Sequence, residues 1–265
     1  FEVRDLWPES AIDTGIVSNK WLIKFSYWFE KKVYHRAKLI NVLTPAFKKA
    51  LLEKGIDEQK MIYIPNGSDF TLSDELLVNF NSEQFKSQLG FQNNFVITYV
   101  GAHGVANHLE QIIDTAELLV DTNVVFQFIG DGMNKKKLIN DVNERNLKNI
   151  IFKDPVSKNE IFKFILASDM GLSVLKKTDT FKAIYSNKTF DYMSCKKPIL
   201  LCIDGVSRDL IKKADCGIYA EPENPEEIAS AIRQYIGDKK RLDHEGENGY
   251  KYAKKYFDRN NLANK

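Results

Sequence analysis

The hydrophobic pattern of this chain is most regular from Phe95 onward. Short, continuous apolar runs alternate there with longer stretches in which apolar residues recur at the spacing of one helical face. Buried strands that alternate with amphipathic helices are typical of a parallel sheet covered by helices on both faces. The predicted strands are 95–100, 124–129, 149–152, 170–174, 198–203 and 217–219. The predicted helices are 107–121, 133–145, 157–167, 187–195, 206–213, 225–236 and 243–256. The predicted fold class is therefore α/β, with a doubly wound parallel sheet.

Residues 1–67 form a separate region in this pattern. The predicted elements there are strands at 1–4, 39–44 and 61–64, a loop at 5–10 and a helix at 45–55. The turn residues Pro65–Asp69 predict a domain boundary. Residues 70–93 are polar and predict a connector that contains a helix.

A helix with an aromatic face and a basic face is predicted over Trp21–Arg36. Its apolar positions follow one wide stripe, namely Trp21, Leu22, Phe25, Trp28, Phe29 and Val33. Between Lys20 and Lys49 there are eight basic residues and one acidic residue. The pattern has two interpretations. The helix lies on an anionic membrane surface, or it packs its aromatic side chains on the sheet and leaves its lysines in water.

Composition limits the possible partners. A net charge of +2 is too small to indicate nucleic-acid binding. The three cysteines lack the spacing of a metal site and predict reduced thiols in the core of a cytosolic protein. No apolar run approaches the ~18 residues of a membrane span, and no signal peptide is recognised. Since the chain opens on Phe1 inside a predicted strand, we expect it to be the later part of a longer protein.

The stretch from Tyr185 to Pro198 carries the main candidate chemistry. Ser186 and Asn187 are good helix N-caps, so Lys188 falls in the first turn of a helix that opens toward a cleft. Backbone N–H groups, the helix dipole and an ammonium together suit a diphosphate. Asp191, one turn on, could accept hydrogen bonds from ribose hydroxyls. The alternative is a capped surface helix with a solvated lysine.

Three other loops follow predicted strands at the edge where open parallel sheets bind ligands. Their sequences are Gly101-Ala102-His103-Gly104, Gly130-Asp131-Gly132 and Asp154-Pro155-Val156. The first lacks the G-x-G-x-x-G fingerprint, which argues against NAD, but its small residues let backbone amides approach a phosphate. His103 contacts the sugar or phosphate, or is merely solvated. The second loop approaches a ligand closely or is an ordinary turn. In the third, Pro155 and Val156 could flank a flat base.

A fourth loop, Lys176–Asn187, is long and contains no glycine. A long loop at this edge of a sheet often closes over a ligand. This loop is therefore a candidate to close over a ligand.

These segments, taken in order, resemble the GT-B glycosyltransferases of family 4. The resemblance is closest to bacterial aminosugar transferases, of the N-acetyl-fucosamine type, in O-antigen and capsule assembly. It is carried by Asp5–Ser10, Pro65–Asp69, Tyr99–Gly101, Gly130–Gly132, Ser186–Lys188, Asp191–Met193 and Lys197–Ile199. It implies that 1–67 is the last part of an acceptor-side domain and that 68–240 binds the nucleotide sugar. It also implies that 241–265 is a C-terminal helix that packs back toward the acceptor-side domain.

The resemblance also implies roles for individual residues. Lys188 and Asp191 would be catalytic, Lys188 by holding the diphosphate and Asp191 by holding the ribose. The implied nucleotide-sugar contacts are Gly101, Ala102, His103, Gly104, Gly130, Asp131, Gly132, Pro155, Val156, Tyr185, Ser186, Asn187, Lys188 and Asp191. The chain departs from the family pattern in three places. Asp191 replaces the usual glutamate, Ala183 replaces the first glutamate of E-x7-E, and the arginine and lysine after the Gly101 loop are missing.

The expected reaction is transfer of an aminosugar from a UDP-sugar to a lipid-linked saccharide at the cytoplasmic membrane face. The resemblance implies retention of anomeric configuration, no metal and no cofactor besides the donor. Two other classes stay open, a UDP-sugar epimerase of the same architecture and a nucleotide-binding module without activity. On its own, this chain is expected to bind UDP without catalysing transfer.

Overall fold

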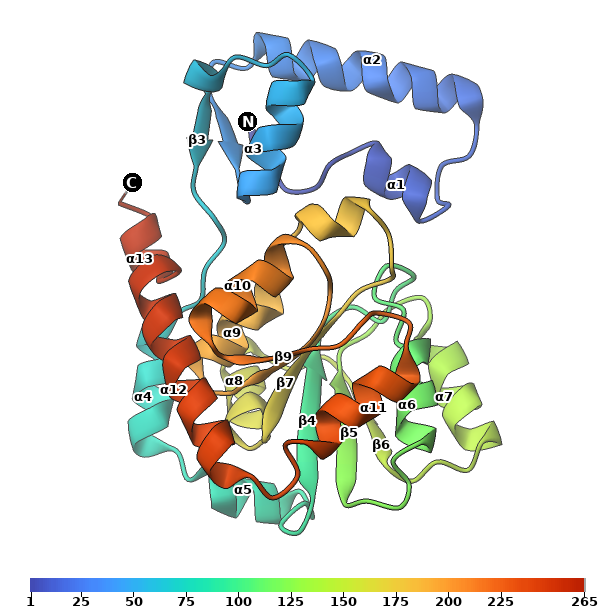
Figure 1. Ribbon diagram of the computed structural model, residues 1–265, viewed down its shortest axis with the longest axis vertical. Helices are drawn as coiled ribbons and strands as arrows, with labels where there is room; N and C mark the ends of the chain where they lie inside the picture. The colour runs from blue at the N-terminus through green and yellow to red at the C-terminus, as the bar shows by residue number, and fades with distance from the viewer. Residues whose placement is uncertain (265) are drawn as a thin grey trace.

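The chain forms two parallel sheets joined by a linker in the computed structural model, which describes residues 1–264 (Figure 1). The smaller sheet has the order β1-β2-β3, with β1 (Glu2–Val3), β2 (Ile40–Val42) and β3 (Met61–Tyr63). The larger sheet has the order β6-β5-β4-β7-β8-β9. Its strands are β4 (Phe95–Val100), β5 (Val124–Ile129), β6 (Ile150–Lys153), β7 (Met170–Val174), β8 (Ile199–Cys202) and β9 (Gly217–Tyr219). Neighbouring strands are parallel in both sheets, so the α/β fold class is confirmed.

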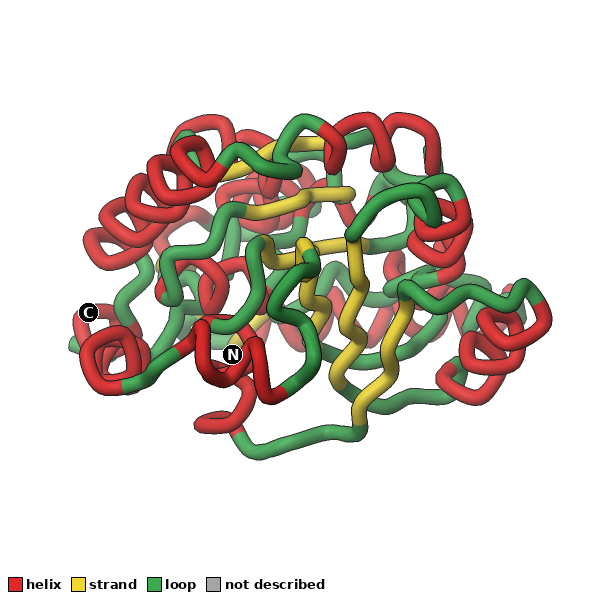
Figure 2. Tube along the Cα trace, turned by 90° about the horizontal axis from the view of Figure 1, so that it is seen from below, coloured by secondary structure: helices red, strands yellow, loops and turns green. Residues whose placement is uncertain are grey.

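Helices cover both faces of the larger sheet (Figure 2). Side chains of β8 alternate between two cores, since Leu200 and Cys202 belong to one and Ile199 and Leu201 to the other. The first core is closed by α6 (Glu110–Glu117), α7 (Lys135–Glu144) and α11 (Pro225–Arg233). The second is closed by α4 (Phe70–Asn79), α8 (Lys158–Leu166), α9 (Asn187–Ser194), α10 (Val206–Ala214) and α12 (Lys239–Tyr256).

The predicted boundaries of four strands, 95–100, 124–129, 170–174 and 217–219, match the observed ones. The connector 70–93 holds two helices rather than one, because Asp69 caps α4 and Asn81 caps a second helix, α5 (Ser82–Gln88). The prediction of a loop over 5–10 is wrong for its last two residues, because α1 (Glu9–Asp13) begins at Glu9. The loop Lys176–Asn187 contains a short 3₁₀ helix, η2 (Thr180–Ala183).

The end of the chain returns to the linker between the two sheets. Figure 1 shows α12 and α13 (Arg259–Leu262) leading back toward the segment between β3 and α4. The backbone N–H of Ser68 donates to the carbonyl of Phe257 (3.0 Å), and the N–H of Arg259 donates to the carbonyl of Ser68 (3.0 Å). A β-carbon on Gly67 would lie 2.2 Å from the Phe257 carbonyl oxygen, so only glycine fits there. The linker is therefore fastened to the larger unit.

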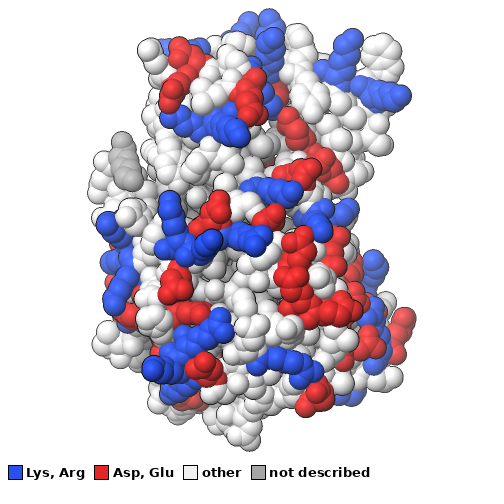
Figure 3. Space-filling model, viewed as in Figure 1, with Lys and Arg blue, Asp and Glu red and all other residues white. Residues whose placement is uncertain are grey.

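Helix α2 (Lys20–Arg36) turns its polar stripe inward and its aromatic stripe outward. Ser26, Glu30 and Tyr34 are buried, and Glu30 pairs with Lys54 from the segment after α3 (Pro45–Glu53). The exposed side chains of the aromatic stripe are Trp21 (81%), Leu22 (50%), Phe25 (57%), Trp28 (56%) and Phe29 (50%). The interpretation in which these aromatics pack on the sheet is therefore wrong. Lys and Arg side chains are also exposed at the end of the molecule where α2 lies (Figure 3).

The three cysteines lie in the core, as predicted. Cys195, Cys202 and Cys216 are buried and none of them forms a disulfide. Burial raises the pKa of each of the three thiols. None of the helices between residues 1 and 264 combines the length and apolar character required to cross a bilayer.

Candidate functional site

Lys188 lies at the carboxyl edge of the larger sheet, in the first turn of α9. Its amine is 4.5 Å from the centroid of the Tyr99 ring, and a β-carbon built on Gly101 would lie 3.5 Å from that amine. Burial lowers the pKa of Lys188 to about 8, and no carboxylate within residues 1–264 is close enough to offset this effect. The lysine is thus not the solvated surface residue of the alternative interpretation. An anion bound here would supply the counter-charge that the partly buried ammonium lacks.

The Gly101 and Gly130 loops lie directly against each other. Gly130 has φ +149°, and a β-carbon on it would be 1.9 Å from the carbonyl oxygen of Gly101. Gly132 has φ +158°, and its β-carbon would be 2.5 Å from the carbonyl oxygen of His103. Neither the interpretation of the second loop as a close approach to a ligand nor its interpretation as an ordinary turn describes this packing of loop against loop. These glycines let the second loop pack against the first, and Gly101 of the first loop lies beside Lys188.

The interpretation of His103 as a solvated loop histidine is wrong. Its side chain is fully buried and packs near the rings of Tyr99, Phe128 and Phe152, at centroid distances of 6.0, 6.3 and 6.0 Å. Neither ring nitrogen has a hydrogen-bond partner in the described part of the chain. Burial lowers the pKa of His103 to about 4, helped by the charge of Lys135. The imidazole is therefore neutral at pH 7.

Asp191 faces the linker. Its Oδ1 accepts a 2.6 Å hydrogen bond from the hydroxyl of Ser68, which is buried. Burial raises the pKa of Asp191, while the Ser68 hydrogen bond opposes that rise. No local pattern indicates this contact, because Ser68 lies 123 residues away and has the sequence surroundings of an ordinary turn residue.

The start of α9 is held by hydrogen bonds from two directions. Ser186 is at the N-cap position but makes no side-chain capping bond, so only part of the capping prediction is correct. Asn187 accepts a 2.7 Å hydrogen bond from Asn66 of the linker, and Thr189 shares a 2.7 Å hydrogen bond with Ser173 of β7. These contacts fix the position of Lys188 between them.

A pocket of about 500 Å³ adjoins this helix start, between the two sheets. Both units contribute to it, and its lining includes Arg4, Asp5, Thr44, Asn66, Phe181, Tyr185, Ser186 and Asn187. The Lys176–Asn187 loop borders this pocket and is tied to the smaller unit, because Thr44 donates a 2.7 Å hydrogen bond to the Ala183 carbonyl. A second pocket, of about 520 Å³, lies along the same loop, and several of its charged side chains pair with one another. Examples are Lys177 with Glu221 (2.8 Å) and Lys182 with Asp179 (2.7 Å).

The third loop follows β6. Pro155 is exposed and Val156 is partly exposed, so their side chains are available to a ligand. Lys135 at the start of α7 ties this loop to the second one, since its amine donates to the carbonyl of Gly130 (2.8 Å) and pairs with Asp154 (2.6 Å). The sequence interpretation missed Lys135. Its only signal was a lysine in the turn after Gly132.

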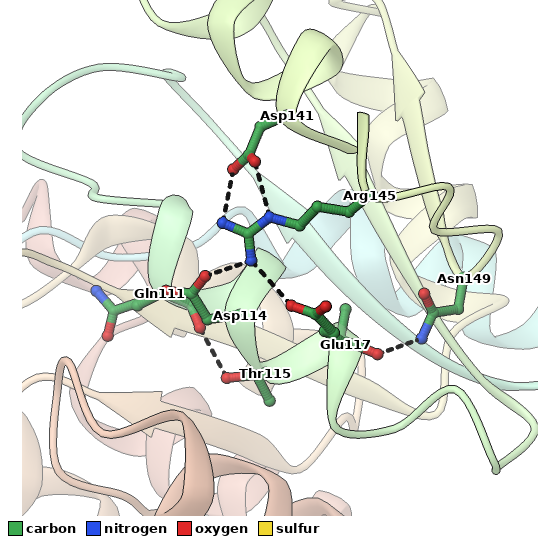
Figure 4. Close-up of polar contacts among 8 residues, drawn as sticks. Gln111, Asp114, Thr115, Glu117, Asp141, Arg145 and Asn149 are labelled. Carbon is green, nitrogen blue, oxygen red and sulfur yellow. Dashed lines mark hydrogen bonds and ion pairs between the residues drawn. The ribbon is translucent and has the colours of Figure 1, made fainter. Parts of the chain in front are cut away.

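A dense charged network, by contrast, lies near the amino ends of the strands. Figure 4 shows Arg145 at its centre, where the guanidinium pairs with Asp141 (2.8 Å), Asp114 (2.7 Å) and Glu117 (3.1 Å). Because these carboxylates come from α6 and α7, the network fastens the two helices to each other. Across residues 1–264, no group of three or more His, Cys, Asp or Glu side chains is arranged to hold a metal ion.

Two α/β units, each with a parallel sheet, joined by a linker that is fastened to the second unit, form the architecture of a GT-B glycosyltransferase. Anabaena HepE, solved in complex with UDP, superposes with a TM-score of 0.81 at 18% identity, over 99% of this chain and 69% of that one. WaaG, a glycosyltransferase involved in lipopolysaccharide biosynthesis, gives a TM-score of 0.74 at 15% identity, over 96% of this chain and 70% of that one. Residues 81–252 match the family Glycosyl transferases group 1, and the chain belongs to this family.

Two curated relatives are similar in sequence. One is WcaI of Escherichia coli (strain K12), a candidate colanic acid biosynthesis glycosyl transferase, which is 22% identical over 78% of this chain and 52% of its own length. The other is alpha-galactosylglucosyldiacylglycerol synthase of Streptococcus pneumoniae (strain ATCC BAA-255 / R6), 26% identical over 76% of this chain and 52% of its own. The chain spans about half the length of the curated relatives it matches.

Proposed function

We propose that this protein transfers an aminosugar from a UDP-sugar to a lipid-linked saccharide in the synthesis of a surface polysaccharide. The observation that carries the proposal is the Lys188 amine, which lies against the Gly101 loop with no carboxylate partner among residues 1–264. Further support comes from HepE, whose structures hold UDP and UDP-glucose. WcaI is named for colanic acid biosynthesis, and the Streptococcus pneumoniae relative is named as an alpha-galactosylglucosyldiacylglycerol synthase.

In this proposal, the chemistry is stabilisation of the leaving diphosphate as the glycosidic bond breaks. Lys188 and the backbone amides at the start of α9 neutralise the charge that develops on the phosphoryl oxygens. The backbone of the Gly101 loop approaches the diphosphate. Asp191 holds the ribose, and Pro155 with Val156 flanks the base. Transfer proceeds with retention at the anomeric carbon and without a metal ion.

The proposal assigns residues 1–67 to the acceptor-side domain, 68–240 to the donor-binding domain and 241–265 to a C-terminal segment, which holds two helices, α12 and α13, rather than the one expected from the sequence. It places α2 at the cytoplasmic face of the membrane, where the lipid-linked acceptor lies. The support for this placement is the exposed aromatic stripe of α2, which runs beside exposed lysines.

Calorimetry with UDP tests the nucleotide part of the proposal. We expect UDP to bind this chain and Lys188→Ala to weaken binding strongly, whereas equal affinity of the two proteins would contradict the assignment of Lys188. A product assay on the complete protein, with UDP-sugar and lipid-linked acceptor, then distinguishes the reaction classes. Glycosylated lipid supports the transferase, epimerised donor without acceptor would indicate an epimerase, and neither product would indicate a binding module.

A further inference from the structure

Ser68 of the linker touches the carboxylate that we propose to hold the ribose. Its hydroxyl donates to Oδ1 of Asp191 at 2.6 Å, a length typical of a charge-assisted O–H···O⁻ hydrogen bond. Ser194 extends the contact into a chain. Its hydroxyl lies 3.0 Å from that of Ser68 and donates to the backbone carbonyl of Asp191 at 2.9 Å. One oxygen of the carboxylate is thus held by the linker.

The Ser68 hydroxyl has a fixed position because the residue is held on both sides. Its N–H donates to the carbonyl of Phe257, and its own carbonyl accepts from the N–H of Arg259, each at 3.0 Å. The residue is fully buried. The Asp191 carboxylate cannot rotate freely while it accepts this hydrogen bond.

We propose that Ser68 is a positioning residue for the nucleotide ribose, which it serves by holding Oδ1 of Asp191 and leaving Oδ2 for the ribose hydroxyls. This inference rests on the proposed function of Asp191. The side chain of aspartate is one methylene shorter than that of glutamate and reaches less far. The Asp191 carboxylate therefore contacts the ribose only when it faces the ribose, so a fixed orientation is valuable to it. Ser68 provides that orientation from outside the helix that carries Asp191.

Ser68 also favours the ionised form of Asp191. Burial raises the pKa of this carboxyl, and the nearby charge of Asp69 acts in the same direction. The Ser68 hydrogen bond opposes the rise, together with the charges of Lys158 and Arg259. Loss of the Ser68 hydroxyl therefore raises the pKa of Asp191 further. A protonated carboxyl is a poorer acceptor for ribose hydroxyls, so the effect of losing Ser68 grows as the pH falls.

The test is UDP affinity by calorimetry at pH 5.5 and pH 8, for wild type and Ser68→Ala. We expect Ser68→Ala to lose affinity roughly tenfold at pH 5.5 and less than about threefold at pH 8. Ser194→Ala keeps the bond to Oδ1 and is expected to show a smaller loss in the same pH direction. Ser73→Ala is the matched control, because Ser73 is an equally buried serine that bonds only its own helix.

Two results would overturn the inference. One is a Ser68→Ala affinity equal to that of Ser73→Ala at both pH values, and the other is an equal loss at both, which a purely structural role would give. A wild-type protein that binds no UDP would instead refute the proposed function. An NMR titration of the Asp191 carboxyl carbon without UDP provides a separate readout, in which Ser68→Ala must titrate at a higher pH than wild type.

Discussion

Replacement of Lys188 by methionine should stabilise the fold while it weakens nucleotide binding. Methionine keeps an unbranched side chain of similar length and removes the charge that burial disfavours. The fall in the pKa of Lys188 from 10.5 to about 8 corresponds to about 3 kcal/mol against the charged form in the folded state. Loss of the cation–π contact with Tyr99, at 4.5 Å, offsets about 0.5–1 kcal/mol of this gain. We expect a net gain of about 2 kcal/mol at pH 7, or an increase in Tm of about 4–8 °C.

The pH dependence follows from the same shift. Between pH 8 and 10.5 the unfolded chain holds the Lys188 proton more strongly than the folded protein does, so wild-type stability rises with pH across this window. The Lys188→Met variant lacks this rise, and its advantage over wild type should therefore disappear by about pH 10.5. Below pH 8 the advantage is fully present.

UDP affinity should change in the opposite direction. Loss of a hydrogen bond between charged groups costs about 1.5–3 kcal/mol, or roughly 10- to 150-fold in Kd. Urea unfolding at pH 7 and pH 10 measures the stability, calorimetry measures the affinity, and Lys136→Met provides a control at an exposed lysine of α7. A Lys188→Met variant that is less stable than wild type at pH 7, or that binds UDP equally well, would refute this account of Lys188.

Three further predictions concern the loops and α2. Gly130→Ala should destabilise the fold by about 3 kcal/mol in urea unfolding, because its β-carbon would lie 1.9 Å from a carbonyl oxygen of the facing loop. Gly104→Ala should destabilise the fold much less, because its β-carbon would lie 3.8 Å from the nearest atom, Oδ1 of Asn107. His103 should make the fold less stable by up to about 3 kcal/mol as the pH falls from 6.5 to 4, since the unfolded chain binds its proton more readily, and His103→Leu should reduce this acid sensitivity. Trp28→Ser should weaken binding to anionic vesicles in sedimentation assays about tenfold, whereas Val78→Ser on α4, also exposed, should have no effect.

The larger sheet could be predicted because its strands are buried on both faces. Strands such as 95–100 and 124–129 are continuous apolar runs, and a run of this kind between two amphipathic helices has few other places in a folded chain. The candidate position of Lys188 could be predicted for a related reason. The end of a parallel strand and the start of the next helix meet at one edge of the sheet by topology alone.

The surroundings of individual side chains could not be predicted in the same way. Apolar periodicity located the aromatic stripe of α2, but not the inward ion pair of Glu30 with Lys54 that turns this stripe outward. The Gly101 loop was recognised as a candidate site, but not the rings that enclose His103, two of which come from neighbouring strands. Such contacts depend on pairs of residues that are far apart in the sequence and carry no local signal.

The fastening of Gly67 and Ser68 by the end of the chain has a practical consequence for the design of shortened forms of this protein. The family match stops at residue 252, which invites a shortened donor-binding unit that ends there. Such a truncation would delete Phe257 and Arg259 and with them both backbone hydrogen bonds that secure the linker. A unit intended to retain the candidate site should therefore start no later than Asn66 and extend through Leu262.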